Sequence, residues 1–452
     1  MQNAKLTLML TLSAVTLSAC TLAPKYVRPA PPVASQWPID TPTTADVHLK
    51  WRDLFLDKRL QSTIDLAIAQ NRDLRVAALN IDHAQAQYRI QRSALLPAIN
   101  ASGTSTRNQT SDTYSANLGL AAYEVDLFGR VRSLKDAALE SFFAERENRN
   151  AVQISLIAAV AQQWLTLAAD QDALRLAKQT QAGQLDTLKI AEGRARIGVL
   201  SDLDLNQITV QAETARADVA RLETVIDQDK AALTLLVGAP LTPDLLPDGL
   251  TSGLVIDALP VGLPSDVLLA RPDVLTAEHD LKSANANIGA ARAAFFPRIT
   301  LTGSTGSSSS DLDGLFKSGT NTWSFSPAIS VPIFAGGANR AGLDSAKINR
   351  DIAVAQYEKA IQSAFSDVSD ALAVRSRIDE RLSAQTAATN AASRSLTLSQ
   401  ARYDTGSDSY LVLLDAQRTL YSAQQTLISL QALRATNLVA LYRALGDDTS
   451  LN

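Results

Sequence analysis

Two long stretches of this chain repeat one another in the same register. The matching residues are Asp73 with Asp273, Arg92 with Arg292, and Pro97 with Pro297, each 200 positions apart. Farther along, the offset has grown to 208, since Gly198 recurs as Gly406. This period far exceeds the roughly 20 to 50 residues of a solenoid repeat. The chain is therefore a tandem duplication, and each half must be a substantial unit that pairs pseudo-symmetrically with the other.

The N-terminus has the layout of a lipoprotein signal. Lys5 precedes an apolar run that starts at Leu6, and Leu17-Ser18-Ala19-Cys20 ends the run with small residues. This pattern predicts a signal peptide over residues 1–19. The four residues resemble a bacterial lipobox, which implies cleavage before Cys20 and a diacylglycerol and an N-acyl chain on it. Thr21 follows, whereas Asp at this place usually retains such lipoproteins in the inner membrane, so we expect the outer membrane.

Composition excludes several functions. The net charge of −4 shows no excess of the basic residues that bind nucleic acid, so no nucleic-acid partner is expected. Cys20 is the only cysteine, which leaves no disulfide and no thiolate metal site. The histidines, His48, His83 and His279, lie far apart along the chain, and they do not form the motifs with acidic residues or cysteine that metal sites use. Nucleophile-elbow and phosphate-loop motifs are absent. We therefore expect no catalytic, cofactor-binding or metal site, and a partner must supply energy.

Proline divides the chain into extended and helical parts. Six prolines lie between Cys20 and Trp51, and they predict an extended tether. No proline occurs between Pro97 and Pro240 or after Pro332, and these tracts are rich in helix-forming residues. A continuous helix from about Arg132 to Ile197 would be about 100 Å long. Charges throughout predict that it lies in water.

One stretch of this helix is long enough to cross a bilayer. Residues 150–169 carry no charge, but they include polar side chains, and their large apolar residues step by three and four. That spacing is typical of a packing seam. The seam residues are Ile154, Ile157, Ala161, Trp164 and Ala168. Similar seams occur near Ile361 and Leu420, and they predict packed helix pairs.

Between the helices, each half contains a predicted β-hairpin. The segments are 98–110 with 115–128, and 298–310 with 321–334. In the last segment, Trp323, Phe325 and Ile329 alternate with small polar residues, which is typical of a strand. Each strand is long enough for a tilted transmembrane strand. Soluble hairpins capping a helical bundle remain an alternative. If the strands are in lipid, four cannot close a barrel, so several chains must share one, and three would leave room for a lumen.

Together these features resemble a known family. The motifs are Trp51-Arg52-Asp53, Tyr123-Glu124-Val125-Asp126-Leu127-Phe128-Gly129, Arg271-Pro272-Asp273, Ile288-Gly289-Ala290-Ala291-Arg292-Ala293-Ala294-Phe295-Phe296-Pro297 and Leu413-Leu414-Asp415-Ala416-Gln417-Arg418. In this order they resemble the OprM/TolC family of outer-membrane efflux factors, over nearly the whole mature chain.

This resemblance implies a mainly α-helical protein with a membrane β-barrel. A homotrimer would form a twelve-stranded β-barrel in the outer membrane, joined to a long periplasmic α-helical barrel. The expected partners are outer-membrane lipid, a periplasmic adaptor (membrane fusion) protein and, through it, a proton-driven inner-membrane efflux pump. The expected segments are a lipid-anchored tether and equatorial segment (20–60), a first repeat (61–238, hairpin 97–128), an equatorial linker (239–262), a second repeat (263–446, hairpin 297–334) and a C-terminal tail (447–452).

Two turns and one helix start are the candidate functional residues. Gly198 and Gly406 lie between long helical tracts, where a left-handed C-terminal cap favours glycine. The resemblance implies that these turns meet the adaptor, through Gly198, Val199, Leu200, Gly406, Ser407 and Asp408.

The resemblance also implies a periplasmic gate. Leu411 and Asp415 share a helix face, as do Asp415 and Arg418. In the family the matching positions narrow a closed aperture, with the arginine in restraining contacts. A plainer interpretation is a carboxylate near a helix start with a local Asp415–Arg418 ion pair.

These observations predict a passive efflux duct. Two alternatives remain open: an exit duct of a type I protein secretion system, and a non-channel coiled-coil lipoprotein that acts as a spacer.

Overall fold

The computed structural model describes residues 21–38, 50–250, 254–255 and 268–446. The predicted signal peptide and Cys20 therefore lie outside the described residues, as do residues 251–253 and 256–262 of the equatorial linker and the whole C-terminal tail. The chain forms two compact units, each built from three separate segments. Among the described residues, unit 1 comprises 21–32, 78–148 and 273–360, and unit 2 comprises the others.

The helices repeat in length as well as in sequence. The first half contains α4 (Arg72–Ser93), α5 (Arg130–Arg196) and α6 (Asp202–Val237), of 22, 67 and 36 residues. The second half contains α8 (Pro272–Ala293), α9 (Ala338–Asp404) and α10 (Tyr410–Leu445), with the same three lengths. The uninterrupted helix predicted from the proline-free tract is thus confirmed, and its copy has the same length.

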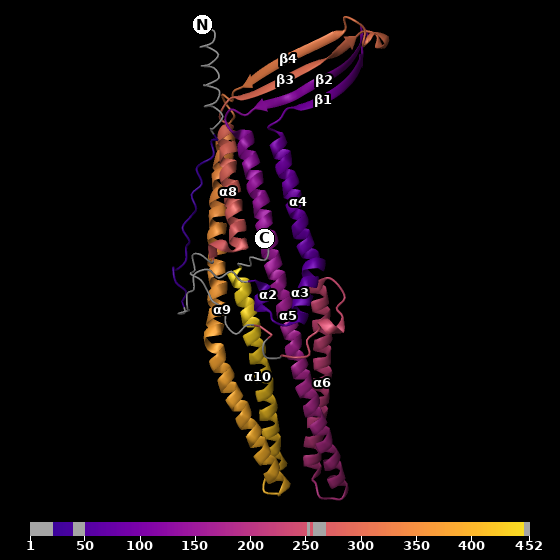
Figure 1. The fold of residues 1–452 in the computed structure, drawn as a ribbon, viewed down its shortest axis with the longest axis vertical. Coiled ribbons are helices and arrows are strands. Elements are labelled where there is room, and N and C mark those ends of the chain that lie inside the picture. Colours follow the sequence, from indigo (N-terminus) through magenta and orange to yellow (C-terminus); the bar gives the residue numbers. More distant parts are fainter. Residues whose placement is uncertain (1–20, 39–49, 251–253, 256–267, 447–452) are drawn as a thin grey trace. The chain divides into compact units, whose positions relative to one another are not determined.

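Unit 1 carries an antiparallel sheet in the order β1-β2-β3-β4 (Figure 1). The strands are β1 (Ala98–Arg107), β2 (Asp112–Val125), β3 (Arg298–Ser309) and β4 (Asn321–Ser330). Both predicted hairpins are confirmed, and β2 pairs with β3, so the sheet joins the two repeats. β4 ends at Ser330 rather than Phe334, because Pro332 has no N–H to donate to a ladder.

The proline-rich segment is extended but not free. Residues 21–38 contain neither helix nor strand, and in unit 1 the part from Thr21 to Arg28 lies along α8. The side chains of Asn285 and Arg292 donate to the carbonyls of Pro24 and Leu22 at 2.7 and 2.9 Å. A Cβ on Gly289 would lie 2.7 Å from the Ala23 nitrogen, so only glycine permits this approach. The segment that was predicted as a tether is therefore strapped to a helix.

A buried carboxylate fixes the other end of this strap. Glu278 is 2% exposed and accepts hydrogen bonds from the Tyr26 hydroxyl at 2.9 Å and from Nε and Nη2 of Arg28 at 2.9 and 2.7 Å. Lys282 is 3.3 Å away on the same helix. A buried carboxylate is tolerated because it is paired and hydrogen-bonded.

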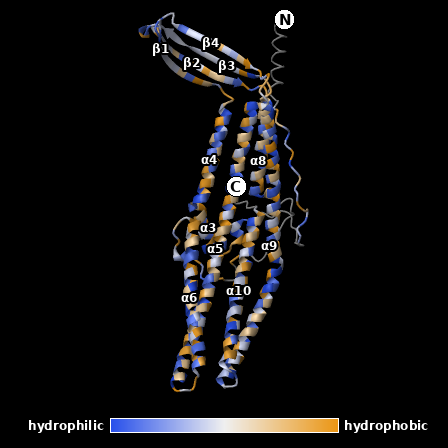
Figure 2. Cartoon of the chain, turned by 180° about the vertical axis from the view of Figure 1, so that it is seen from behind, coloured by the Kyte–Doolittle hydropathy of each residue, from blue (hydrophilic) through white to orange (hydrophobic). Residues whose placement is uncertain are grey.

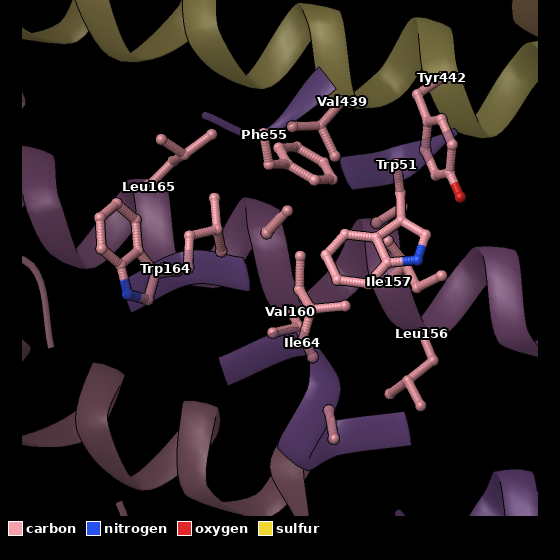
Figure 3. Packing of buried hydrophobic residues seen from close by; sticks show 14 of the residues in the cluster. Trp51, Phe55, Ile64, Leu156, Ile157, Val160, Trp164, Leu165, Val439 and Tyr442 are labelled. Carbon is pink, nitrogen blue, oxygen red and sulfur yellow. The ribbon is translucent and has the colours of Figure 1, made fainter. Parts of the chain in front are cut away.

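Unit 2 contains the main apolar core. Here α2 (Trp51–Leu54), α3 (Lys58–Gln70) and the 3-10 turn η1 (Pro243–Leu245) pack against α5, α6 and α10. Figure 3 shows Trp51 and Phe55 lying between Ile157 and Val160 of α5 and Val439 and Tyr442 of α10. The Trp164 ring is fully buried, and its indole N–H donates to the Leu245 carbonyl at 2.9 Å.

The same core accounts for the uncharged stretch of α5. Among the described residues, α5 is the one helix long and apolar enough to cross a membrane. Its seam residues Ile154, Ile157, Ala161, Trp164 and Ala168 are all buried at 3% exposure or less. The prediction of a packing seam is confirmed.

Candidate functional site

Both candidate turns have the same backbone geometry. At the end of α5, the Val199 N–H donates to the Arg194 carbonyl, and the Gly198 N–H donates to the Ala195 carbonyl, both at 2.9 Å. At the end of α9, Ser407 and Gly406 donate in the same way to Arg402 and Tyr403, at 2.8 and 2.9 Å. This pair of bonds defines the Schellman motif. The central glycines have φ of +76° and +71°, as the sequence predicted.

The side chains of the two turns differ. In Figure 2 the turn between α5 and α6 carries the hydrophobic colour, whereas the turn between α9 and α10 is paler. Ile197 and Val199 in the first turn are 73% and 71% exposed. In the second turn, the Arg402 guanidinium binds both oxygens of Asp408 at 2.6 and 2.8 Å. These hydrogen bonds hold the pKa of Asp408 below its ordinary value.

The start of α10 presents the predicted gate residues on one face. Leu411 is 60% exposed and Asp415 is exposed, whereas Leu413 and Leu414 are buried. The buried residues pack with Ala191, Ile208 and Tyr410 in a small apolar cluster of unit 2. This cluster fixes the rotation of α10, and the rotation leaves Leu411 and Asp415 on its open side.

Arg418 has a different partner from the one expected from its spacing. Its Nε donates to the Gln211 side-chain oxygen on α6 at 3.2 Å. The described side chains show no ion pair between Asp415 and Arg418, so the plainer interpretation of a local pair is wrong. Arg418 thus contacts another helix and does not pair with Asp415.

Two more contacts join α10 to the first-half helices. The Gln184 side chain of α5 donates to Gln417 at 3.0 Å, and the Tyr421 hydroxyl donates to Asp218 of α6. Burial, followed by the hydrogen bond to Asp218, raises the pKa of Tyr421. With the Arg418–Gln211 contact they form a polar latch, which we define as Gln417, Arg418 and Tyr421 with Gln184, Gln211 and Asp218. The latch lines a cavity of about 820 Å³ between α5, α6, α9 and α10 in unit 2.

Sequence reasoning found the α10 side of this latch only in part. Arg418 was predicted, but Gln184, Gln211 and Asp218 were not, because polar residues are common along the exposed faces of both helices. The only available signal was spacing, since Gln417 and Tyr421 are four residues apart and share a face. In the described parts of the chain, no group of three or more His, Cys, Asp or Glu side chains could hold a metal ion. His279, however, has an acidic neighbour, since its Nδ1 lies 2.7 Å from Glu140 on another helix.

Comparisons with known proteins match the chain nearly end to end. A family model described as "Outer membrane efflux protein" matches residues 63–239 and 263–447. The probable efflux pump outer membrane protein TtgC of Pseudomonas putida is 45% identical over 97% of this chain and 95% of its own. Outer membrane protein OprJ of Pseudomonas aeruginosa is 40% identical, over 96% and 94%. The open state of the MtrE outer membrane channel of Neisseria gonorrhoeae is 42% identical, with a TM-score of 0.86 over 95% of this chain and 100% of that one.

Proposed function

Because this chain belongs to the family of outer membrane efflux proteins, we propose that it is the outer-membrane duct of a tripartite efflux system. The duct passively conducts drugs and other small molecules from the periplasm to the outside. The names of the relatives refer to efflux pumps, which favours this role over protein secretion. Energy comes from an inner-membrane pump that reaches the duct through a periplasmic adaptor.

The observation that carries this proposal is the sheet of unit 1. Its outer strands β1 and β4 each have one unpaired edge and are exposed along their whole length. Trp323, Phe325 and Ile329 of β4 are 79%, 60% and 68% exposed. Open edges are not tolerated in hydrocarbon, so in a membrane β1 of one copy must pair with β4 of the next. Three copies give twelve strands, and a barrel of that size leaves room for a lumen.

The lipid anchor is part of the proposal. Cys20 directly precedes the segment strapped along α8, so acyl chains on Cys20 would tie unit 1 to the outer membrane. Mass spectrometry of the mature chain tests this, since three acyl chains add a mass that a Cys20→Ala variant lacks.

We assign the two turns to the adaptor and the start of α10 to a gate. Three copies of Leu411 around an axis would narrow the passage and resist wetting, and three copies of Asp415 would repel anions. The polar latch would hold α10 against α5 and α6 in the closed state. An adaptor that binds the open state better would shift the population towards it.

Conductance in planar bilayers tests the gate. Replacing Leu411 and Asp415 together with alanine should raise the single-channel conductance several-fold, by widening a constriction that limits flow. The duplication supplies a matched control, Leu203→Ala with Gln207→Ala, at the same places in α6. If the control raises conductance equally, or the α10 variant does not raise it, the gate does not lie at these residues.

A further inference from the structure

The strand register sorts the sheet of unit 1 into two chemically different faces. Residues directly opposite one another in an antiparallel pair point to the same face. The first face is apolar, and across the four strands it includes Ile99, Leu120, Leu301, Phe325 and Ile329. The second face carries Ser102, Asn117, Thr302, Ser304, Ser324 and Ser326. Under the proposed function the first face meets lipid and the second lines the lumen.

Charge is confined to the two ends of the sheet. The four strands contain only four charged residues: Arg107, Asp112, Glu124 and Arg298. Arg107 pairs with Asp112 at 3.2 Å at the hairpin end, on the apolar face. Glu124 and Arg298 lie at the opposite end, next to the helices, on the polar face. Apart from these two residues, the polar face of the strands is uncharged.

A β-bulge in β2 places Glu124 on that face. The pairing with β3 shifts between Leu120 and Tyr123, so three steps along β2 correspond to two along β3. Ala122 within the bulge has φ of +23°, which is unusual for a residue with a side chain. Without the extra residue, strict alternation would turn Glu124 to the apolar face. The bulge instead sets Glu124 opposite Thr300, beside Arg298.

The resulting cluster carries more positive than negative charge. Glu124, whose side chain is 10% exposed, binds Arg130 at 2.7 Å and Arg298 at 2.6 Å. Arg130 holds both carboxylate oxygens, at 2.8 and 2.7 Å. Two guanidinium groups thus share one carboxylate. Arg298 is the more open of the two, at 58% side-chain exposure against 34% for Arg130.

From this geometry we infer that Arg298 forms a basic ring at the helix end of the barrel lumen, which raises the permeability of the duct to anions. The inference rests on the proposed function, since it needs three copies around a shared lumen. Each copy contributes one excess positive charge here, because Arg298 and Arg130 of α5 share the single carboxylate of Glu124. The rest of the polar strand face is uncharged. Rings of arginine favour anions in pores. The solutes affected are small anions and drugs that carry a carboxylate.

Reversal potentials across planar bilayers under a potassium chloride gradient test this inference. Low salt is required, because the Debye length is about 10 Å at 0.1 M. Arg298→Gln should lower the chloride-to-potassium permeability ratio by about twofold, and Arg298→Glu should lower it further. Arg298→Lys keeps the charge and should retain the wild-type ratio. Arg107→Gln removes a charge from the other face and should leave the ratio unchanged.

The possible outcomes separate the inference from the proposed function. If wild-type protein forms no channels, the duct itself is wrong. If all variants conduct but Arg298→Glu has the wild-type reversal potential, the basic ring is wrong and the duct stands. An equal shift in Arg107→Gln would also overturn the ring, because the effect would then not be confined to the polar face.

Discussion

The turn after α5 and the turn after α9 share a backbone but not a chemistry. Both close with the same two hydrogen bonds around a left-handed glycine. The first turn exposes Ile197 and Val199, whereas the second holds an Arg402–Asp408 ion pair. Duplication has therefore kept the feature that lets two helices reverse direction. The side chains have been free to diverge, which allows the two turns to make different contacts.

The helices that lead away from these turns differ in the same way. In the first helical hairpin, formed by α5 and α6, Asp170 of α5 lies beside Asp229 of α6. The matching positions 208 residues later are Ile378, which is fully buried, and Asn437, which donates to the Ala371 carbonyl at 3.0 Å. One hairpin thus contains a pair of like charges where its copy contains an apolar residue and an amide. This difference predicts that only the first hairpin responds to pH near neutrality.

Changes to the backbone that the two turns share have the largest expected effect on stability. Gly198→Ala and Gly406→Ala should each lower the free energy of unfolding by about 1 to 2 kcal/mol, the cost of a Cβ in the left-handed region. A Cβ at either glycine would meet nothing within 4 Å, so the two costs should be equal. Thermal unfolding followed by helical circular dichroism measures both. Markedly unequal costs would show that the turns are not equivalent.

The acidic pair of the first hairpin gives the next largest effect. Burial, followed by a hydrogen bond to Asp229, raises the pKa of Asp170 to about 6. Its charged form is therefore disfavoured in the fold, so stability is fully present below the ordinary value of 3.8 and is lost as pH rises through about 6. Asp170→Asn should raise the free energy of unfolding by about 1 kcal/mol at pH 7.5, a value reduced for solvent screening. The gain should vanish near pH 3.5.

A neighbouring carboxylate provides the control for this pH effect. Asp172 accepts hydrogen bonds from the Leu250 N–H at 2.8 Å and from Arg175 at 2.5 Å. Asp172→Asn should therefore lower stability at pH 7.5, the opposite sign. If both variants change stability in the same direction, the raised pKa of Asp170 is not the cause.

The helix caps after the two turns give a smaller difference. The Ser201 hydroxyl accepts from the Asp204 N–H at 3.1 Å, whereas Ser409 makes no side-chain cap bond. Ser201→Ala should lower the free energy of unfolding by about 0.5 kcal/mol, at the low end for loss of an N-cap, and Ser409→Ala should leave it almost unchanged. Thermal unfolding of the two variants side by side tests this. Equal losses would mean that Ser409 caps α10 in solution.

The ion pair of the second turn gives the smallest effect. Asp408→Ala should leave the melting temperature unchanged, because an exposed ion pair contributes little to global stability. It should nevertheless speed amide hydrogen exchange at Gly406 and Ser407, which the pair helps to hold in place. Arg402→Gln should act in the same way. Unchanged exchange in both variants would show that the backbone alone holds the turn.

Much of the fold could be predicted from patterns along the chain. The proline-free tracts predicted α5 and α9, and strict alternation from Thr322 to Ser330 predicted β4. The partner of Arg418 could not be predicted in this way. Asp415 is its neighbour by helical spacing, but Gln211 is its neighbour in space, from a helix about 200 positions earlier. Spacing describes one helix only, and the choice of partner depends on two.

The sequence by itself determined the duplication, the helix lengths, the hairpins and the glycine turns, because each depends on local backbone preference or on residues close together in the chain. Tertiary structure decided which polar groups meet: the strap on Glu278, the polar latch on α10, and the two arginines around Glu124. The physical reason is that a buried carboxylate or guanidinium takes whichever partner packing brings within hydrogen-bond distance. That partner can lie 250 positions away, as Arg28 does from Glu278.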